Sequence, residues 1–568
     1  MIPTPDQPTW EAPGPGAWRS LADHLPGSVT PIYAELHARA TASGFAAMFE
    51  SLGVPVATLT EAHVHGHTYV QLRPLIMAGR DAPLPPRAAV WAMARLHPAF
   101  RRRSRTARRV LTERPWLEAP RVWAEQSGPQ RQAVNAGLAG VALETLNDAE
   151  LWTHVRDCIV NLEDGHRLHF EMHGPDMAPV GLLLAAGRTW GLDQVDLLDA
   201  LGASSPASGA MNRHFDALRR AVRAAGVEPG TLAGIEELRA VSPEVAGLLD
   251  ALMAERGWCL VTSYDLDGRA LVEVPELILA GIARPAPPTR PATDTAGRIA
   301  ALRERVPARE RERFDLLAGD ALATYGLRDE NGPHNVQIPA GLLRRALLEV
   351  GRRLAGREQI ADPAHIFEMS LDEVRSFLSP PPTMAGPSAS DLAGRARRRS
   401  VTSAFTPPAT LGPETPDVPI EALPPALGAM SGAMILALES VQGGGHPLPL
   451  CGDGIGTEVV RGRACVASDA ADALARLEPG DILVTTTTTP AHNALLALVG
   501  GLVAAQGGQF SHSAIMAREL GLSAVVGVAG AAEHIASGDL IEIDPRAGVV
   551  AVIAQRAVQP PSTTSEAP

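Results

Sequence analysis

The stretch 507–527, GGQFSHSAIMARELGLSAVVG, predicts a sharp turn followed by a short helix. Two glycines come soon after the apolar run Leu495–Val503, and glycine lets the backbone turn where other residues resist it. Ala514–Leu520 then supplies good helix formers. Gly521 follows them, at the position where helices commonly end. The stretch therefore presents its polar Ser-His-Ser triplet at the start of a helix.

His512, the centre of that triplet, is expected at the helix N-terminus, with Ser511 or Ser513 as the cap. Free backbone N–H groups and the positive end of the helix dipole favour an anionic group there by about 0.3–1 kcal/mol. Near pH 7 an imidazole is partly neutral, and its nitrogen lone pair is nucleophilic. A histidine that accepts a phosphoryl group suits this position. The alternative is a histidine that only caps the helix.

This stretch resembles the phosphohistidine segment of the phosphoenolpyruvate (PEP)-utilising enzymes, which include PEP synthase, pyruvate phosphate dikinase and rifampicin phosphotransferase. The shared pattern is a double glycine, Ser/Thr-His, a small apolar pair, Ala-Arg-Glu, a glycine and Ala-Val-Val-Gly. The resemblance implies that His512 carries a phosphoryl group between two active sites on a swivelling domain.

The resemblance also implies phosphate-binding candidates around His512. They are Ser511 and Ser513, Arg518, and Thr489, which matches a family threonine. For Arg518 an equally good alternative is a pair with Glu519, or an interaction with the carboxyl ends of neighbouring strands.

The composition is that of an ordinary soluble chain of roughly three or four domains. Of its 568 residues 45% are hydrophobic, and the net charge is −13. There is no apolar run of about 18 residues, no signal-peptide pattern at the N-terminus, and no Cys-x-x-Cys pair. We therefore expect a cytoplasmic protein that binds neither membrane nor nucleic acid and offers no metal ligands.

The sequence contains no lysine, so arginine and histidine supply all its basic side chains. Walker A loops, protein kinases and ATP-grasp domains all use lysine on nucleotide phosphates, although arginine can in principle substitute. We therefore expect ATP and Mg²⁺ to act only through a partner subunit, with neither bound by this chain alone.

Residues 18–379 are predicted to form a mainly α-helical substrate-binding domain behind a loose tail at 1–17. Helical periodicity dominates between about 130 and 250, and Leu342–Leu354 is a strong helix. The opening from Trp18 and the ordered segments Arg328–Asn331, Asp362–Phe367 and Leu371–Val374 resemble rifampicin phosphotransferase-like proteins. That resemblance makes Arg328 and Glu330 candidates to contact the phosphoryl group or the substrate. An ATP-grasp domain precedes this point in full-length relatives and is not expected here.

Two histidine patterns stand out in this region. His63, His65 and His67 alternate as on one strand, which favours a solvated strand over a metal site. His166, His169 and His173 share one face of a predicted helix, which lines a pocket or forms a polar side.

Residues 380–447 are predicted to be a Pro-rich linker, with 11 prolines between Pro380 and Pro425. Such a segment gives a swivelling domain the reach it needs. Short apolar strands alternating with helices then predict a small α/β domain over 448–556, which the resemblance makes the phosphohistidine domain. Residues 557–568 are expected to be a disordered tail.

The leading hypothesis is the acceptor component of a split phosphotransferase. A separate ATP-grasp protein would charge His512, which would then phosphorylate a hydroxylated small molecule bound by the helical domain. The PEP-binding barrel of PEP synthase is not seen in the sequence, which disfavours PEP chemistry. The alternative is a non-catalytic ligand-binding or regulatory relative; a third reading, direct use of PEP or another donor, has no visible donor site.

Overall fold

A computed structural model describes residues 8–22, 24–76, 86–202, 210–283, 294–378, 386–413, 419–442, 449–468, 470–478, 480–488, 492–496 and 498–555. The helices before residue 443 are α1 (Pro31–Leu52), α2 (Arg87–Leu96), α3 (Pro98–Glu113), α4 (Ala119–Val122), α5 (Gly128–Ala139), α6 (Asp148–Trp190), α7 (Gln194–Leu201), α8 (Ala210–Ala224), α9 (Ile235–Ala240), α10 (Pro243–Arg256), α11 (Pro275–Ala283), α12 (Thr295–Arg305), α13 (Arg311–Thr324), α14 (Leu327–Gly332), α15 (Ile338–Gly356), α16 (Leu371–Leu378), α17 (Ala389–Ser403) and α18 (Pro425–Gln442).

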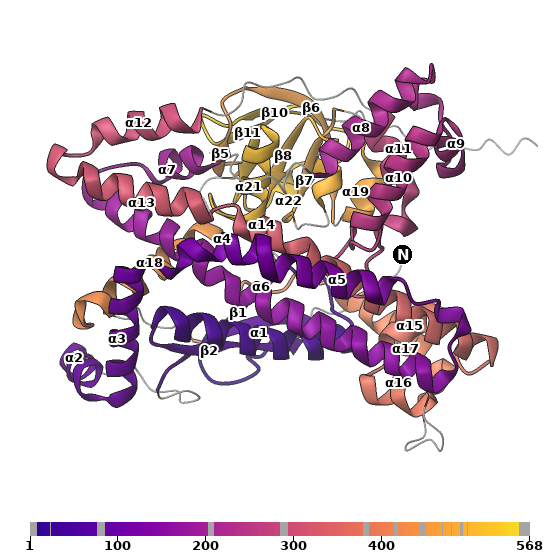
Figure 1. The fold of residues 1–568 in the computed structure, drawn as a ribbon, viewed down its shortest axis with the longest axis horizontal. Coiled ribbons are helices and arrows are strands. Elements are labelled where there is room, and N and C mark those ends of the chain that lie inside the picture. The colour runs from indigo at the N-terminus through magenta and orange to yellow at the C-terminus, as the bar shows by residue number, and fades with distance from the viewer. Residues whose placement is uncertain are drawn as a thin grey trace, which may run out of the picture.

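The long helix α6 is the axis of this region, and α1, α13, α15 and α18 all pack against it (Figure 1). A capping box starts it, because the Asn147 side chain accepts from the Glu150 backbone N–H and the Glu150 side chain accepts in return. Gly191, with φ of 69°, ends it. At Gly181 a Cβ atom would lie 2.0 Å from the Ala433 carbonyl oxygen, so glycine there permits the close approach of α18.

A small antiparallel sheet in the order β2-β3-β1-β4 accompanies these helices. Its strands are β1 (Trp18–Ser20), β2 (Val56–Val64), β3 (His67–Pro74) and β4 (Thr410–Leu411). The prediction of a single strand carrying His63, His65 and His67 was wrong, because a hairpin turn separates β2 from β3. His65 and Gly66 form that turn with φ of 51° and 81°, the left-handed pair of a tight hairpin.

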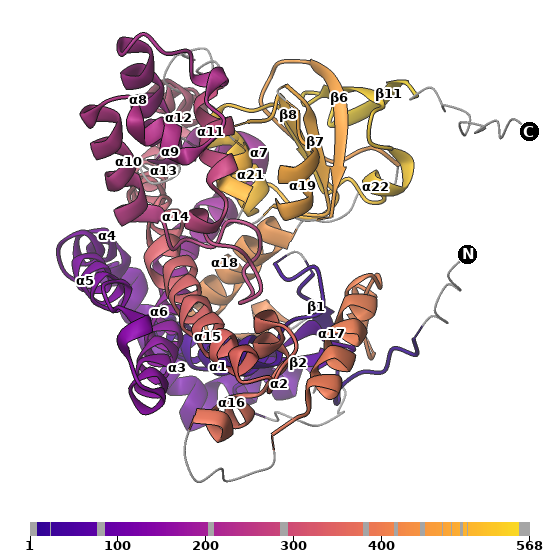
Figure 2. The ribbon, with the colours of Figure 1, turned by 90° about the vertical axis from the view of Figure 1, so that its right-hand side faces the viewer.

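The C-terminal region folds as a mixed sheet in the order β11-β10-β6-β7-β8-β9-β5, with β6 to β9 parallel. Its strands are β5 (Asp453–Ile455), β6 (Val460–Ala467), β7 (Ile482–Thr485), β8 (Gly501–Ala504), β9 (Ala524–Val526), β10 (Leu540–Asp544) and β11 (Val549–Ala554). Its helices are α19 (Ala470–Arg476), α20 (Asn493–Leu496), α21 (His512–Leu520) and α22 (Ala531–His534). Figures 1 and 2 place α21 on the side of this region that is turned toward the helices before it.

The interval 380–447 differs from the extended linker that its prolines predicted, because the described part of it contains α17 and α18. Leu392 on α17 and Leu427, Met430 and Ala433 on α18 are fully buried, so both helices belong to the packed body. The stretches 379–385, 414–418 and 443–448 lie outside the described residues.

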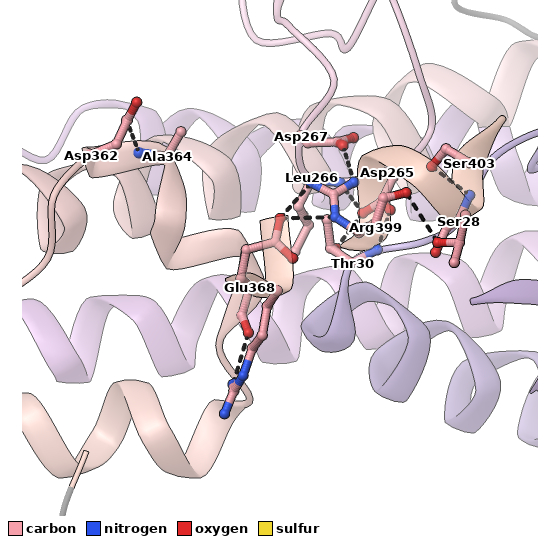
Figure 3. Close-up of polar contacts among 12 residues, drawn as sticks. Ser28, Thr30, Asp265, Leu266, Asp267, Asp362, Ala364, Glu368, Arg399 and Ser403 are labelled. Carbon is pink, nitrogen blue, oxygen red and sulfur yellow. Dashed lines mark hydrogen bonds and ion pairs between the residues drawn. The ribbon is translucent and has the colours of Figure 1, made fainter. Parts of the chain in front are cut away.

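Polar contacts fasten α17 to the body (Figure 3). Arg399 pairs with Asp267 at 2.6 Å and with Glu368 at 2.8 Å. The Ser28 backbone N–H donates to the Ser403 hydroxyl at 3.1 Å. Beside this contact, Asp265 accepts hydrogen bonds from the backbone N–H and the hydroxyl of Thr30.

The predicted fold class is therefore confirmed: a large, mainly helical region precedes a C-terminal domain built on a mixed sheet. The exact domain boundaries stay predictions. Within the described residues, no helix has the length and apolar character needed to span a membrane.

Candidate active site

The start of α21 places His512 as the sequence predicted. Ser511 is the N-cap, and its hydroxyl accepts from the Ala514 backbone N–H at 3.3 Å. Gly521 ends the helix in the left-handed conformation, with φ of 62°. His512 is the first residue of the helix and is half-buried, so its ring is not sealed inside a core. A phosphoryl group on this ring would lie near the positive end of α21.

The two serines beside His512 have different surroundings. Ser513 is fully buried, its Oγ lies 2.8 Å from Thr488 Oγ1, and it accepts from the Thr488 backbone N–H at 3.2 Å. Ser513 therefore joins the start of α21 to the loop after β7. Thr489, the predicted threonine of that loop, lies outside the described residues.

The loop that leads to His512 is bonded to the end of α18. The Gly508 backbone N–H donates to the Val441 carbonyl at 3.0 Å, and the Phe510 N–H donates to the Ser440 carbonyl at 2.7 Å. Ser440 is itself held by Gln194, whose side-chain amide donates to its hydroxyl at 2.6 Å. The C-terminal domain is thus docked on the helical region, with His512 at the junction.

Arg518 makes a second connection across this junction. Its Nε donates to Asp199 of α7 at 2.5 Å, and its two terminal nitrogens donate to the backbone and side-chain carbonyls of Gln509. The Arg518 side chain is only 5% exposed. Arg518 thus binds a helix of the other region and the loop before His512, and its predicted role in holding phosphate stays a prediction.

Arg328 and Phe510 meet directly at the junction. Arg328, on α14, lies over the Phe510 ring at 5.7 Å, and Phe510 precedes His512 by two residues. Phe510 is fully buried. Arg328 Nη1 is buried and makes no hydrogen bond to any described residue. Of the predicted contacts from the helical region, Arg328 is therefore the one that the fold brings beside the His512 loop.

Glu330 follows Arg328 on α14 and is half-buried. Burial, reinforced by the charge of Asp329, raises the pKa of its carboxyl. Among the described residues, no hydrogen bond or ion pair joins Glu330 to the His512 loop, so its substrate role stays a prediction.

The histidines His166, His169 and His173 of α6 lie close to one another in the helical region. His169 shares a 2.6 Å hydrogen bond with the Asn331 side chain, and its ring lies 4.7 Å from that of His173. Burial lowers the pKa of His166 to about 3 and that of His169 well below its ordinary value. The imidazoles of His166 and His169 are therefore neutral at pH 7.

Tyr325 also lies at the junction, and the sequence did not predict it as a site residue. It follows α13 directly, is 2% exposed, and its ring lies 5.5 Å from that of Phe510. Nothing local distinguishes it from a core tyrosine, so no sequence signal singles it out. For metal binding, no three His, Cys, Asp or Glu side chains in the described ranges are grouped so as to hold an ion.

Residues 477–548 match the family model described as PEP-utilising enzyme, mobile domain. The C-terminal domain is a PEP-utilising enzyme mobile domain. The match spans the Ser-His-Ser triplet, the whole of α21 and the Arg518 contact. The phosphohistidine resemblance of this part of the chain is thereby confirmed, while the roles of the individual site residues stay predictions.

Similarity to complete proteins is distant or partial. Rifampicin phosphotransferase of Streptomyces sviceus is 44% identical over 104 residues, which is 18% of this chain and 12% of that protein. Chondramide synthase of Chondromyces crocatus is 33% identical over 217 residues, 37% of this chain and 5% of that protein. An uncharacterised protein of Mycobacterium tuberculosis is 27% identical over 368 residues, 62% of this chain and 38% of that protein. The chain thus spans well under half the length of each of these relatives.

Proposed function

We propose that the chain is the carrier and acceptor component of a phosphotransferase that works through phosphohistidine at position 512. The observation that carries the proposal is the placement of His512, half-buried at the start of α21 on a loop whose Phe510 contacts Arg328 of the helical region. A carrier histidine has to reach the acceptor, and the docked position brings the His512 loop against the helical region, to which this proposal assigns the acceptor.

Transfer from His512 needs little covalent chemistry from the protein. The bond from phosphorus to the imidazole nitrogen breaks as the bond to an acceptor hydroxyl oxygen forms, and the proton lost by the hydroxyl returns to the freed imidazole. Catalysis then consists of in-line positioning and neutralisation of phosphoryl charge. Arg328 supplies positive charge beside the loop, and the dipole of α21 adds to it.

The proposed acceptor is a hydroxylated small molecule. This choice agrees with the name of one relative, rifampicin phosphotransferase, which specifies a drug as the acceptor. The donor site is assigned to a separate ATP-grasp protein, because the sequence has no lysine for nucleotide phosphates. Mg²⁺ and ATP belong to that partner, which would pass the β-phosphoryl group to His512 and release AMP and inorganic phosphate.

Labelling tests this function. The chain is incubated with the nearest co-encoded ATP-grasp protein and β-³²P-ATP, and separately with ³²P-PEP alone. We expect acid-labile label on the wild type only in the first mixture. His512→Ala should remove it completely, whereas His534→Ala, which alters an exposed histidine of the same domain, should keep it.

Undiminished label on His512→Ala would eliminate the mechanism. Label from PEP alone would replace the ATP-grasp partner by a direct donor. A wild-type chain that neither mixture labels would favour the second function, a ligand-binding or regulatory relative. Binding of a hydroxylated ligand without phosphorylation would then identify it.

A further inference from the structure

Tyr325 places a hydroxyl in the junction without a hydrogen-bond partner. The residue is 2% exposed, its Oη is fully buried, and no described residue bonds to it. A buried polar group without a partner destabilises a fold, so native proteins rarely keep one without a use. Phenylalanine would fill the same space without that penalty. The hydroxyl is therefore expected to meet a partner that joins in another state of the protein.

The surroundings of this hydroxyl belong to both sides of the junction. Its electrostatic neighbours are Arg518 and Glu519 on α21, and Asp199 and Asp329 on the helical side. Burial is the main cause that raises the pKa of Tyr325 to about 12. The phenol therefore stays protonated at neutral pH and is available as a donor.

A second buried donor lies three residues along the chain. Arg328 Nη1 also has no partner among the described residues, and its guanidinium and the Tyr325 ring contact the same Phe510 ring. Two donors without partners thus converge on the loop that carries His512. An acceptor-rich anion is the chemistry that satisfies an O–H and a guanidinium N–H together.

We propose that Tyr325 is a phosphoryl-binding residue, which donates its hydroxyl, together with Arg328 Nη1, to the oxygens of the phosphoryl group on His512 in the docked state. This inference rests on the proposed function, since it assumes that His512 is charged. It adds a specific donor to the site, and it accounts for the unsatisfied hydroxyl of the uncharged protein.

Chemical charging tests the proposal without any partner protein. Potassium phosphoramidate phosphorylates histidines directly, and the difference from His512→Ala identifies the ³¹P NMR signal of position 512. Two donors favour the dianionic phosphoryl group, so they lower its pKa. In Tyr325→Phe we expect that pKa to rise by about one unit, a tenfold change in proton affinity, and Arg328→Gln should act in the same direction.

The matched control is Tyr69→Phe. Tyr69 is also fully buried, but its hydroxyl donates to the Pro408 carbonyl at 3.1 Å. This control should leave the ³¹P pKa unchanged and lower the melting temperature. Tyr325→Phe should keep or raise the melting temperature, because it removes a hydroxyl without a partner.

Two results would overturn the proposal. One is a wild-type His512 that phosphoramidate does not charge. The other is a phosphoryl pKa that is the same in the wild type and in Tyr325→Phe. The proposed function is judged separately by labelling from ATP, so the two failures are distinguishable: label from ATP with an unchanged ³¹P pKa removes only the role of Tyr325.

Discussion

At the scale of single residues, Asp265 combines burial with close hydrogen bonding. The carboxylate accepts from the Thr30 N–H at 2.6 Å and from the Thr30 hydroxyl and the Leu266 N–H at 2.5 Å each. Burial and the neighbouring Asp267 raise its pKa to about 7, against the opposing effects of Thr30 and Arg399. Its ionisation in the folded protein therefore occurs well above the pH at which the unfolded chain ionises.

This pKa predicts a pH-dependent stability. In the unfolded chain the carboxyl ionises near pH 4, whereas in the fold it keeps its proton to about pH 7. The fold therefore binds more protons in this window, and the contribution of Asp265 falls as pH rises from about 4 to about 7, by roughly 2–4 kcal/mol. Thermal unfolding of the wild type and of Asp265→Asn should show the variant gaining relative stability across that window.

Asp362→Asn, at an exposed cap, is the matched control for the loss of one carboxylate. A difference between the wild type and Asp265→Asn that stays constant from pH 4 to pH 7 would contradict the prediction.

The serines beside His512 show what local sequence can predict about single residues. Both were candidate caps, and a cap depends on a few neighbouring backbone groups, so the helix start was predictable. Which of the two serines forms the cap was not predictable. Ser513 is hydrogen-bonded instead to Thr488, a residue 25 positions earlier that only the folded sheet brings near. Tyr325 was missed for the same reason, since its surroundings come from two regions of the chain.

At the scale of elements, the pair between Asp199 and Arg518 joins α7 to α21. Because Arg518 also holds Gln509, this pair sets the position of the loop before His512. Asp199→Asn should weaken the docking by about 1–2 kcal/mol, since Asp199 is 32% exposed and Arg518 is buried. Hydrogen–deuterium exchange of the peptide 508–518 should accelerate.

The control lies on the same helix. Asp196 pairs with Arg305 at 2.6 Å, but both side chains are about half exposed, 49% and 50%. Asp196→Asn should therefore leave exchange in the peptide 508–518 unchanged, because exposed pairs contribute little. Equal exchange in the two variants would show that Asp199 does not position the loop.

The helices α17 and α18 show where element prediction failed. The prolines of this interval suggested an extended spacer, yet those at the start of α18 and before α17 stand where helices tolerate proline. On α18 the buried residues Leu427, Met430 and Met434 recur at helical spacing, and α17 adds the buried Leu392. The prolines therefore mark the helix ends and the connections, whereas the apolar residues between them indicate that the helices are packed against the body.

At the scale of the whole molecule, Phe510 is one of the buried residues that join the two regions. It is fully buried in a cluster that also contains Tyr325, Met434 and Leu201 of the helical region. Truncation of a buried phenylalanine typically costs about 3–5 kcal/mol, and here the loss falls on the contact between regions. Phe510→Ala should therefore increase the radius of gyration measured by small-angle X-ray scattering.

Phe314→Ala is the control, because Phe314 belongs to the same cluster but lies within the helical region on α13. It should lower the melting temperature without the expansion. If Phe510→Ala stays as compact as the wild type, docking depends on other contacts.

The arrangement of the two regions was harder to predict from the sequence than the single residues or the elements. The sequence indicated a helical region and a small α/β domain, because periodicity and motif are local. Docking depends instead on backbone carbonyls at the end of α18 and on a burial pattern shared by distant segments. Neither has a signature in the sequence.

The bonds from the His512 loop to α18 have a consequence for that helix. The last carbonyls of any helix lack partners within it, and here Ser440 and Val441 obtain theirs from Phe510 and Gly508 of another domain. The hydrogen bonds of the final turn of α18 are thus completed by residues of the C-terminal domain. If the domain undocks, as the proposed function requires, those carbonyls would bond to water instead, and the last turn of α18 would lose the partners that complete it.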